Sequence, residues 1–208
     1  RMRTSFRCHP NLGKLFVVAI VFSITLTLTP HYQAFARDQL HLGSNQLFLW
    51  VIAQSGSVGV FSVLAGALAD RYGNRLTLAV LIFGSALAPG WSLTLYYLPW
   101  FADSSVWLTF VALAFSTLVP RVAANYALEL VPEEDHPAAT ALLQFGMTLP
   151  LFASPLLGQL SESWGFRPLL YGAIIVSLAT GGATFVLPEP RHRVARRESV
   201  GKPITAEE

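Results

Sequence analysis

Six long apolar stretches divide this sequence, five of them without Asp, Glu, Lys or Arg, and they constrain its fold more than any other feature. A helix that crosses about 30 Å of hydrocarbon needs about 20 mostly apolar residues. Six segments fit that length with short connections: 15–36, 46–69, 76–102, 104–128, 136–161 and 168–188. Only the fourth contains a charged residue, Arg121. The sequence therefore predicts an all-α membrane protein with six transmembrane helices.

Composition excludes several other classes of protein. Hydrophobic residues make up 53% of the 208 residues and charged residues only 12%, whereas a soluble domain has about 25% charged residues. The basic residues are too few for a surface that follows a phosphate backbone, so we expect no nucleic-acid partner. Cys8 is the only cysteine and the five histidines are scattered. We therefore expect no metal site, no cofactor and no enzymatic activity.

The distribution of cations predicts the orientation of the chain. An even number of spans places both termini on one side of the membrane. That side would carry eleven of the fourteen Lys and Arg residues: Arg1, Arg3, Arg7, Lys14, Arg71, Arg75, Arg191, Arg193, Arg196, Arg197 and Lys202. The opposite side would carry only Arg37 and Arg167. Because cations favour the cytoplasmic side, we expect a multi-pass protein of the plasma (inner) membrane with both termini in the cytoplasm.

An internal repeat relates the two halves of the sequence. Residues 66–75 (GALADRYGNR) align with residues 158–167 (GQLSESWGFR) at an offset of 92 residues. The same offset places the first three spans approximately on the last three. Because three is odd, the second triplet is inverted relative to the first, which is typical of secondary transporters. We therefore expect two inverted three-helix repeats.

Residues 66–75 also resemble the signature loop of the major facilitator superfamily, Gly-x-x-x-Asp-Arg/Lys-x-Gly-x-Arg/Lys. Six spans that carry this loop, with Pro188-Glu189-Pro190-Arg191 after the last span, resemble the C-terminal half of that family, helices seven to twelve. The resemblance implies a permease that moves a small solute, of unknown identity, by alternating access. It also implies a cytoplasmic gate motif with these matching positions: Gly66, Asp70, Arg71, Gly73 and Arg75.

The resemblance also sets the expected domain organisation and partner. Residues 1–13 are expected to form a cytoplasmic segment, residues 14–190 the six-helix domain, and residues 191–208 a cytoplasmic tail. In this family the solute cavity lies between two six-helix halves, of which this sequence contains one. We therefore expect a partner besides the lipid bilayer: a separate first half or a second copy of this chain.

Arg121 is the main candidate for a residue on the solute pathway. It lies about 15 Å from the nearer end of its span, and an ionised group at that depth is costly unless it is paired or faces water. Asn125 and Glu129 follow at four-residue intervals and are expected to share its face. A cavity-facing role is therefore expected, with snorkelling or a structural ion pair as the alternative.

Three further polar residues within spans are candidates for the same pathway. His31 is a candidate for coupling transport to protons, because an imidazole changes its charge near neutral pH; a histidine near the headgroups is the ordinary alternative. Pro30-His31 and Pro120-Arg121 occupy near-equivalent places in the two triplets, as interrupted helices at binding sites do. Gln54 and Gln144 could bind solute or could join helices by hydrogen bonds.

The family resemblance implies a role for Glu129 in the gate. An acid at this position pairs with a loop cation, and Asn74 stands where that cation is usual. Arg75 or Arg71 is therefore expected to supply the charge, unless these residues only fix the topology. Two functions remain open at this stage: half of a solute transporter, or a non-transporting receptor or scaffold that keeps the fold. The polar face of Arg121 favours the transporter.

Overall fold

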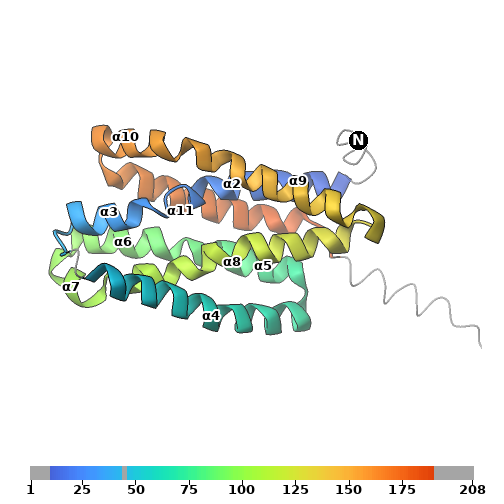
Figure 1. Cartoon of the computed structure of the whole chain (residues 1–208), viewed down its shortest axis with the longest axis horizontal. Helices are drawn as coiled ribbons and strands as arrows, with labels where there is room; N and C mark the ends of the chain where they lie inside the picture. Colours follow the sequence, from blue (N-terminus) through green and yellow to red (C-terminus); the bar gives the residue numbers. More distant parts are fainter. Residues whose placement is uncertain (1–9, 44–45, 190–208) are drawn as a thin grey trace, which may run out of the picture.

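The structure is a computed structural model that describes residues 10–43 and 46–189 as a bundle of helices (Figure 1). Within these ranges, six segments are long and apolar enough to cross a membrane, which confirms the six expected spans. We number them spans 1 to 6: Pro10–Asp38, Leu47–Tyr72, Asn74–Tyr97, Trp107–Leu130, Glu133–Trp164 and Phe166–Val186. The expected tail and most of the expected N-terminal segment lie outside the described residues.

Four of the spans consist of more than one helix. Span 1 contains α2 (Pro10–Leu26) and α3 (His31–Asp38), and span 2 is α4 (Leu47–Tyr72). Span 3 contains α5 (Asn74–Ser85) and α6 (Leu87–Tyr97); η2 (Pro99–Phe101) and α7 (Ala102–Ser105) lead to span 4, which is α8 (Trp107–Leu130). Span 5 contains η3 (Glu133–Asp135), α9 (His136–Thr148), η4 (Leu149–Ala153) and α10 (Ser154–Trp164). Span 6 contains α11 (Phe166–Ala183) and η5 (Thr184–Val186).

The two spans with an internal proline before a polar residue differ in continuity. Span 1 is interrupted before His31, where the hydroxyls of Thr25 and Thr27 donate to carbonyls three residues back and Pro30 has no N–H to donate. In span 4, α8 continues through Pro120 as one helix. The expected parallel between Pro30-His31 and Pro120-Arg121 therefore holds in sequence position but not in helix interruption.

Helix α8 lies in the middle of the bundle and packs against α2, α4, α5, α6 and α9. Figure 1 shows α4 at one edge and α10 at the opposite edge, with α8 between them. Burial follows this arrangement: 56% of the most apolar stretch of span 4 is buried, against 22% for span 5 and 6% for span 2. Spans 2 and 5 therefore leave most of their apolar surface uncovered by this chain.

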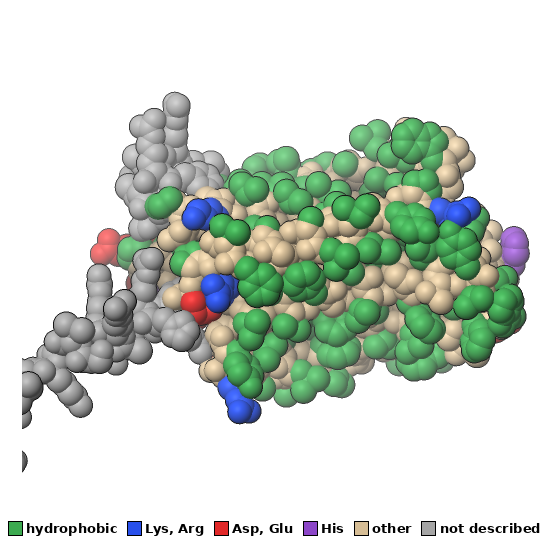
Figure 2. All heavy atoms as spheres, turned by 180° about the vertical axis from the view of Figure 1, so that it is seen from behind, with side chains coloured by type: hydrophobic (Ala, Val, Ile, Leu, Met, Phe, Trp, Pro, Cys, Tyr) green, Lys and Arg blue, Asp and Glu red, His purple; other side chains and the backbone are tan. Residues whose placement is uncertain are grey.

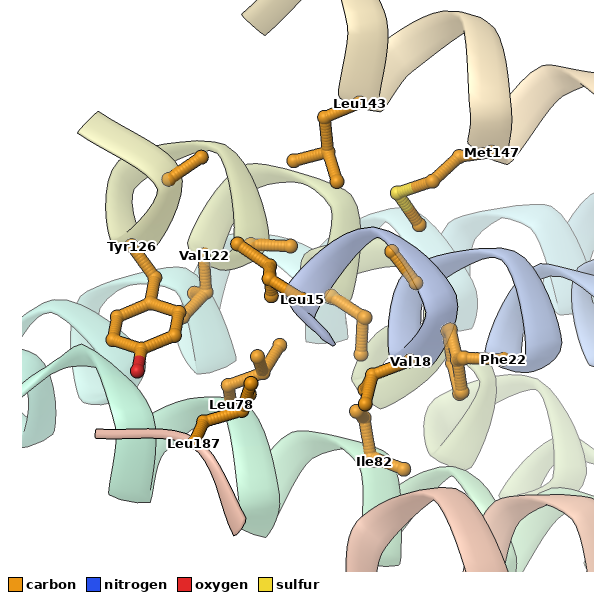
Figure 3. Close-up of a cluster of buried hydrophobic side chains, with 14 of the residues drawn as sticks. Leu15, Val18, Phe22, Leu78, Ile82, Val122, Tyr126, Leu143, Met147 and Leu187 are labelled. Carbon is orange, nitrogen blue, oxygen red and sulfur yellow. The ribbon is translucent and has the colours of Figure 1, made fainter. Parts of the chain in front are cut away.

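Two hydrophobic clusters hold the bundle together, one toward each end. The first joins α2, α5, α8 and α9 near the end of the bundle that holds Pro10 and Glu189, which we call the terminal end (Figure 3). Its largest fully buried side chains include Phe22 and Tyr126. The second cluster, toward the distal end, joins α3, α6, the start of α8 and the start of α11. Trp50 of α4 stacks on Phe110 there, with ring centroids 5.0 Å apart.

The structure supports the internal repeat at two pairs of equivalent positions. Gly73 and Gly165 both have a positive φ, 91° and 77°, and each forms the turn between two helices. Ser85 on α5 donates a 3.1 Å hydrogen bond to Ser177 on α11, the residue 92 positions later. Two equivalent residues that contact each other mark the position of a two-fold axis, so this axis passes between α5 and α11.

Two contacts at opposite ends of the bundle are related by the same axis. At the terminal end, Arg75 pairs with Glu189, with Nε and Oε2 3.4 Å apart. At the distal end, Arg167 donates a hydrogen bond to the Tyr97 hydroxyl. Arg75 and Arg167 are separated by the 92-residue offset, and so are Tyr97 and Glu189. Each contact therefore joins span 3 to span 6 by equivalent positions, and the repeat is inverted.

One broad face of the bundle suits contact with lipid. Figure 2 shows that hydrophobic side chains cover most of the face turned away in Figure 1, with Lys and Arg near its two ends. The exposed hydrophobic residues of α5, α6 and α11 include Val80, Leu87, Ile175 and Leu178. Contact of such a face with lipid tails carries no free-energy penalty, because the tails are as apolar as these side chains.

Candidate functional site

A polar stripe runs along one side of α8. Thr117, Arg121 and Asn125 are exposed, whereas Val119, Val122 and Ala123 between them are buried. Residues four apart lie about 40° from each other around an α-helix, so these three side chains point in one general direction. The Thr117 hydroxyl donates to the Leu113 carbonyl at 2.9 Å, which leaves its oxygen lone pairs facing outward. The stripe is the only face of α8 toward its middle that presents exposed polar groups among the described residues.

Arg121 is the one charged residue in the described part of the chain that lies more than four residues from an end of its span. It stands nine residues before Leu130 and fourteen after Trp107, or about 14 Å and 21 Å along the helix. No hydrogen bond or ion pair joins it to another described residue. A guanidinium at this depth costs about 2.5–3.5 kcal/mol in lipid, so the position favours a surface that faces water or a partner.

Glu129 does not belong to this stripe, contrary to expectation. Its carboxylate is half-buried and accepts a 2.9 Å hydrogen bond from the Asn74 amide at the start of α5. Glu129 lies about 120° around the helix from Thr117, at the margin of the stripe, and its contact with Asn74 holds it toward α5. Asn74 therefore contacts Glu129 directly, although a cation was expected as the partner of this acid.

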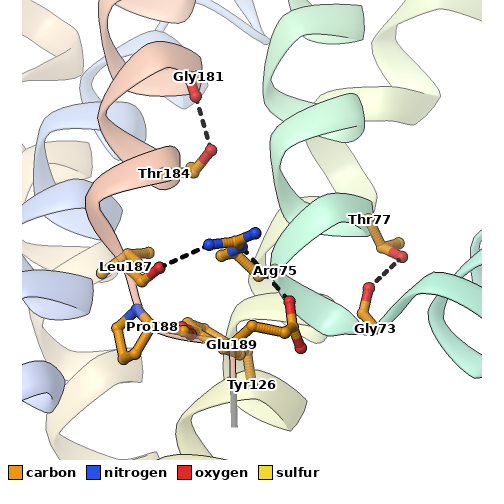
Figure 4. A network of polar contacts seen from close by, with 9 residues as sticks. All are labelled: Gly73, Arg75, Thr77, Tyr126, Gly181, Thr184, Leu187, Pro188 and Glu189. Carbon is orange, nitrogen blue, oxygen red and sulfur yellow. Dashed lines mark hydrogen bonds and ion pairs between the residues drawn. The ribbon is translucent and has the colours of Figure 1, made fainter. Parts of the chain in front are cut away.

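Arg75 has a different partner from the one expected. Its guanidinium pairs with Glu189 and donates a 3.1 Å hydrogen bond to the Leu187 carbonyl, just after span 6 (Figure 4). The Glu189 side chain is 10% exposed and that of Arg75 is 32% exposed. We call Asn74, Arg75, Glu129 and Glu189 the terminal-end cluster. It joins spans 3, 4 and 6.

Two neighbouring residues hold this cluster in place. Gly73 has a φ of 91°, and a Cβ atom there would lie 2.6 Å from Glu189 Oε1. Glycine therefore allows both the turn and the close approach of the carboxylate. Tyr126 of α8 is fully buried, and its hydroxyl donates to the Pro188 carbonyl. The segment at 187–189 is thus fixed from two helices.

The other residues of the expected gate motif are on the surface of α4. Asp70 and Arg71 are exposed in its last turn, and the Arg71 guanidinium lies 5.3 Å from the centre of the Tyr72 ring. A Cβ atom at Gly66 would meet nothing within 4 Å. These three positions therefore lie where a partner at the terminal end can reach them.

His31 lies against α10 rather than on the α8 stripe. Its Nε2 atom is 3.2 Å from the Ser154 carbonyl oxygen and 3.3 Å from the Ser154 hydroxyl. The Ser154 hydroxyl in turn donates to the Thr27 carbonyl in the break of span 1. His31 therefore joins spans 1 and 5 through Ser154.

Gln54 and Gln144 stand on the helices that flank α8. Gln54 is half-buried on α4 and Gln144 is exposed on α9. Near the distal end of α4, a cavity of about 240 Å³ opens between α3 and α4. Gln33 and Arg37 line it beside the indole of Trp50. Arg37 pairs with Asp38 at 2.7 Å.

Sequence reasoning missed Thr117, Tyr126 and Glu189 as members of these sites. Thr117 lies one helical turn before Arg121, which is a sufficient signal for a shared face. Glu189 could have been found from the repeat, because Arg75 and Arg167 are equivalent and their partners share the same offset. Tyr126 carries no such signal, since its contact with Pro188 depends on how spans 4 and 6 approach.

Comparison with known families identifies the class of protein. The family model of the Major Facilitator Superfamily matches residues 15–206, and the chain belongs to this superfamily. It is therefore a multi-pass integral membrane protein of a transporter family, with the six-helix architecture of a half-transporter. No curated protein and no solved structure matches the chain with significance.

Proposed function

We propose that this chain transports a small solute by alternating access, as the C-terminal six-helix half of a secondary transporter. The observation that carries the proposal is the exposed stripe of Thr117, Arg121 and Asn125 on the central helix. A transporter needs a polar, hydrated surface at the membrane midplane between its halves. A receptor or scaffold gains nothing from an Arg that costs several kcal/mol at that depth.

The proposed partner is a second six-helix half, either a separate chain or another copy of this one. Spans 2 and 5 support this, because only 6% and 22% of their apolar stretches are buried within the chain. They flank α8, which carries the stripe, so a partner that covers both would enclose Arg121 in a cavity. Gln54 and Gln144 on these two spans would then lie near the walls of that cavity.

We further propose that the terminal end is cytoplasmic and contains the gate. The excess of Lys and Arg on this side supports the orientation, and we place the protein in the plasma (inner) membrane. Asp70 at the end of α4 would contact the opposite half, favoured by a helix N-terminus there. The contacts of Glu129 with Asn74 and of Arg75 with Glu189 would fix the inner ends of spans 3, 4 and 6 while the gate moves.

Untargeted solute profiling tests the proposal, because it requires no candidate substrate. Cells that express the chain together with a matching first half are compared, by mass spectrometry of cell extracts and medium, with cells in which the chain carries Arg121→Gln. The chain expressed alone is expected to move no solute unless two copies form a dimer. We expect one or a few small solutes to change their distribution across the membrane with the wild-type chain and not with the variant. Equal amounts of both proteins in the membrane fraction are the control for expression.

The association of the chain with a second half is measured in parallel, so that the absence of solute movement can be interpreted. Single cysteines replace Val63 and Ser55 on the exposed side of α4, in a Cys8→Ser background, and cross-linking reports whether copies of the chain meet there. A cross-linked dimer, or a complex with a co-expressed first half, that moves no solute would contradict transport. That outcome would favour the receptor or scaffold.

A further inference from the structure

The charges of the described residues leave one position unbalanced within the membrane. Every described Asp and Glu within a span lies within two residues of an end of that span, while Arg121 lies nine residues from the nearer end. The acids nearest to the terminal end of α8 are engaged there: Glu129 with Asn74 and Glu189 with Arg75. The surface of α8 therefore presents a cation at mid-depth with no described acid at the same level.

A second group next to this cation also lacks a partner within the described chain. Asn125 lies one turn after Arg121 and is exposed, and no described residue makes a hydrogen bond with its amide. Side chains four residues apart on a helix are about 5–6 Å apart at Cβ. The guanidinium and the amide NH₂ together offer several N–H donors to one ligand.

We propose that the transported solute is a small organic anion, whose carboxylate or phosphate group binds Arg121 and Asn125. This inference rests on the transport function proposed above. The guanidinium fork matches the oxygens of a carboxylate or phosphate in a bidentate arrangement. A cationic solute would add a like charge to a surface that is already positive, and a neutral solute would leave Arg121 uncompensated.

The geometry also predicts the order of the contacts. Arg121 neutralises the charge and Asn125 adds directional hydrogen bonds on the terminal side. On the other side, the Thr117 hydroxyl already donates its hydrogen bond to the Leu113 carbonyl. It presents lone pairs, which repel an anion and mark the edge of the site. The anion therefore lies between Arg121 and Asn125 and not between Arg121 and Thr117.

Binding to the purified full chain tests the proposal. The chain is placed in nanodiscs of phosphatidylcholine, so that no anionic lipid competes. Inorganic phosphate, succinate and benzoate are titrated, with succinamide and benzamide as uncharged analogues of the same shape. The readout is the saturable shift of the unfolding midpoint with probe concentration, because a ligand of the native state stabilises it.

Four variants assign the effect to the site. Arg121→Gln is expected to weaken binding of the anion by about tenfold or more, and Arg121→Lys to retain part of it. Asn125→Asp supplies an internal counter-ion for Arg121 and should abolish the shift while the protein remains folded. Lys14→Gln removes an exposed cation near the start of α2 and should leave the shift unchanged.

Either of two results would overturn the anion class. One is an equal shift with the amides, and the other is the absence of any Arg121-dependent shift across all three anions. The latter would assign the counter-charge of Arg121 to an acid of the opposite half. Solute profiling separates this failure from failure of the transport function: a moved solute that is neutral or cationic refutes the anion class and leaves transport intact. A cross-linked dimer, or a complex with a co-expressed first half, that moves no solute refutes transport.

Discussion

Removing the ion pair between Arg75 and Glu189 is expected to destabilise the bundle measurably. Arg75→Gln leaves the Glu189 carboxylate, only 10% exposed, without its cation, and also removes the donor to the Leu187 carbonyl. Loss of one partner from a fully buried pair costs about 3–5 kcal/mol, and from a surface pair about 0–1 kcal/mol. Because Arg75 is 32% exposed, we expect a loss of about 1–3 kcal/mol.

A double-mutant cycle isolates the pair from the other effects of each substitution. Arg75→Gln, Glu189→Gln and the double variant are unfolded reversibly in mixed micelles of dodecyl maltoside and SDS. The expected coupling free energy is about 1–2 kcal/mol, since the two side chains are partly desolvated. The matched control is the equivalent cycle at the distal end, Arg167→Gln with Tyr97→Phe. There both side chains are exposed, so the coupling should be smaller.

The outcome of the cycle decides whether the ion pair between Arg75 and Glu189 contributes to stability. Effects of the two single substitutions that add within about 0.5 kcal/mol would show that Arg75 and Glu189 do not interact. Equal coupling at the two ends would refute the argument from burial. If the effects are additive, the two charges serve only to fix topology.

Three further predictions concern glycines and topology. Gly73→Ala should destabilise the bundle more than Gly165→Ala. Both residues have a positive φ, but only at Gly73 would the Cβ meet another group, Glu189 Oε1 at 2.6 Å. Equal midpoints of unfolding for the two variants would contradict this. Gly146→Ala should be destabilising, because its Cβ would overlap the Phe16 ring, while Gly172→Ala has open space and should be near neutral in the same assay. Single cysteines at Ser104 and Glu134, in a Cys8→Ser background, should react with an impermeant reagent in sealed cells only at Ser104; the reverse pattern would invert the orientation.

The number and limits of the spans were predictable from sequence because lipid imposes a simple rule on them. Each apolar stretch of about 20 residues corresponds to a span, and all described charged residues of the spans except Arg121 lie within four residues of an end. The inverted repeat was also predictable, from the alignment of 66–75 with 158–167. Its equivalent glycines, Gly73 and Gly165, adopt the same positive-φ turn. Arg121, the one described charge more than four residues from an end of its span, was identified for the same reason.

The breaks and the polar contacts between spans were not predictable in the same way. Pro30 and Pro120 look alike in sequence, but of their two spans only span 1 is interrupted. Helix α8 continues through Pro120 because it is held by packing against five helices. The pairing of Arg75 depended on which spans are neighbours and on the end of span 6. Glu129 was expected beside Arg121, but its half-buried carboxylate contacts Asn74 of the neighbouring α5, a contact that depends on how spans 3 and 4 pack.

Water accessibility along α8 tests most directly whether this chain forms half of a solute pathway. Thr117→Cys and Asn125→Cys flank Arg121, and Val80→Cys and Ile175→Cys lie on the face assigned to lipid, all in a Cys8→Ser background. Thiolate formation requires water, so a charged methanethiosulfonate reagent should modify the two α8 cysteines in the membrane-embedded protein. The cysteines at Val80 and Ile175 should remain unmodified. Equal lack of reaction at all four positions would show that the α8 stripe faces no water and would contradict the account.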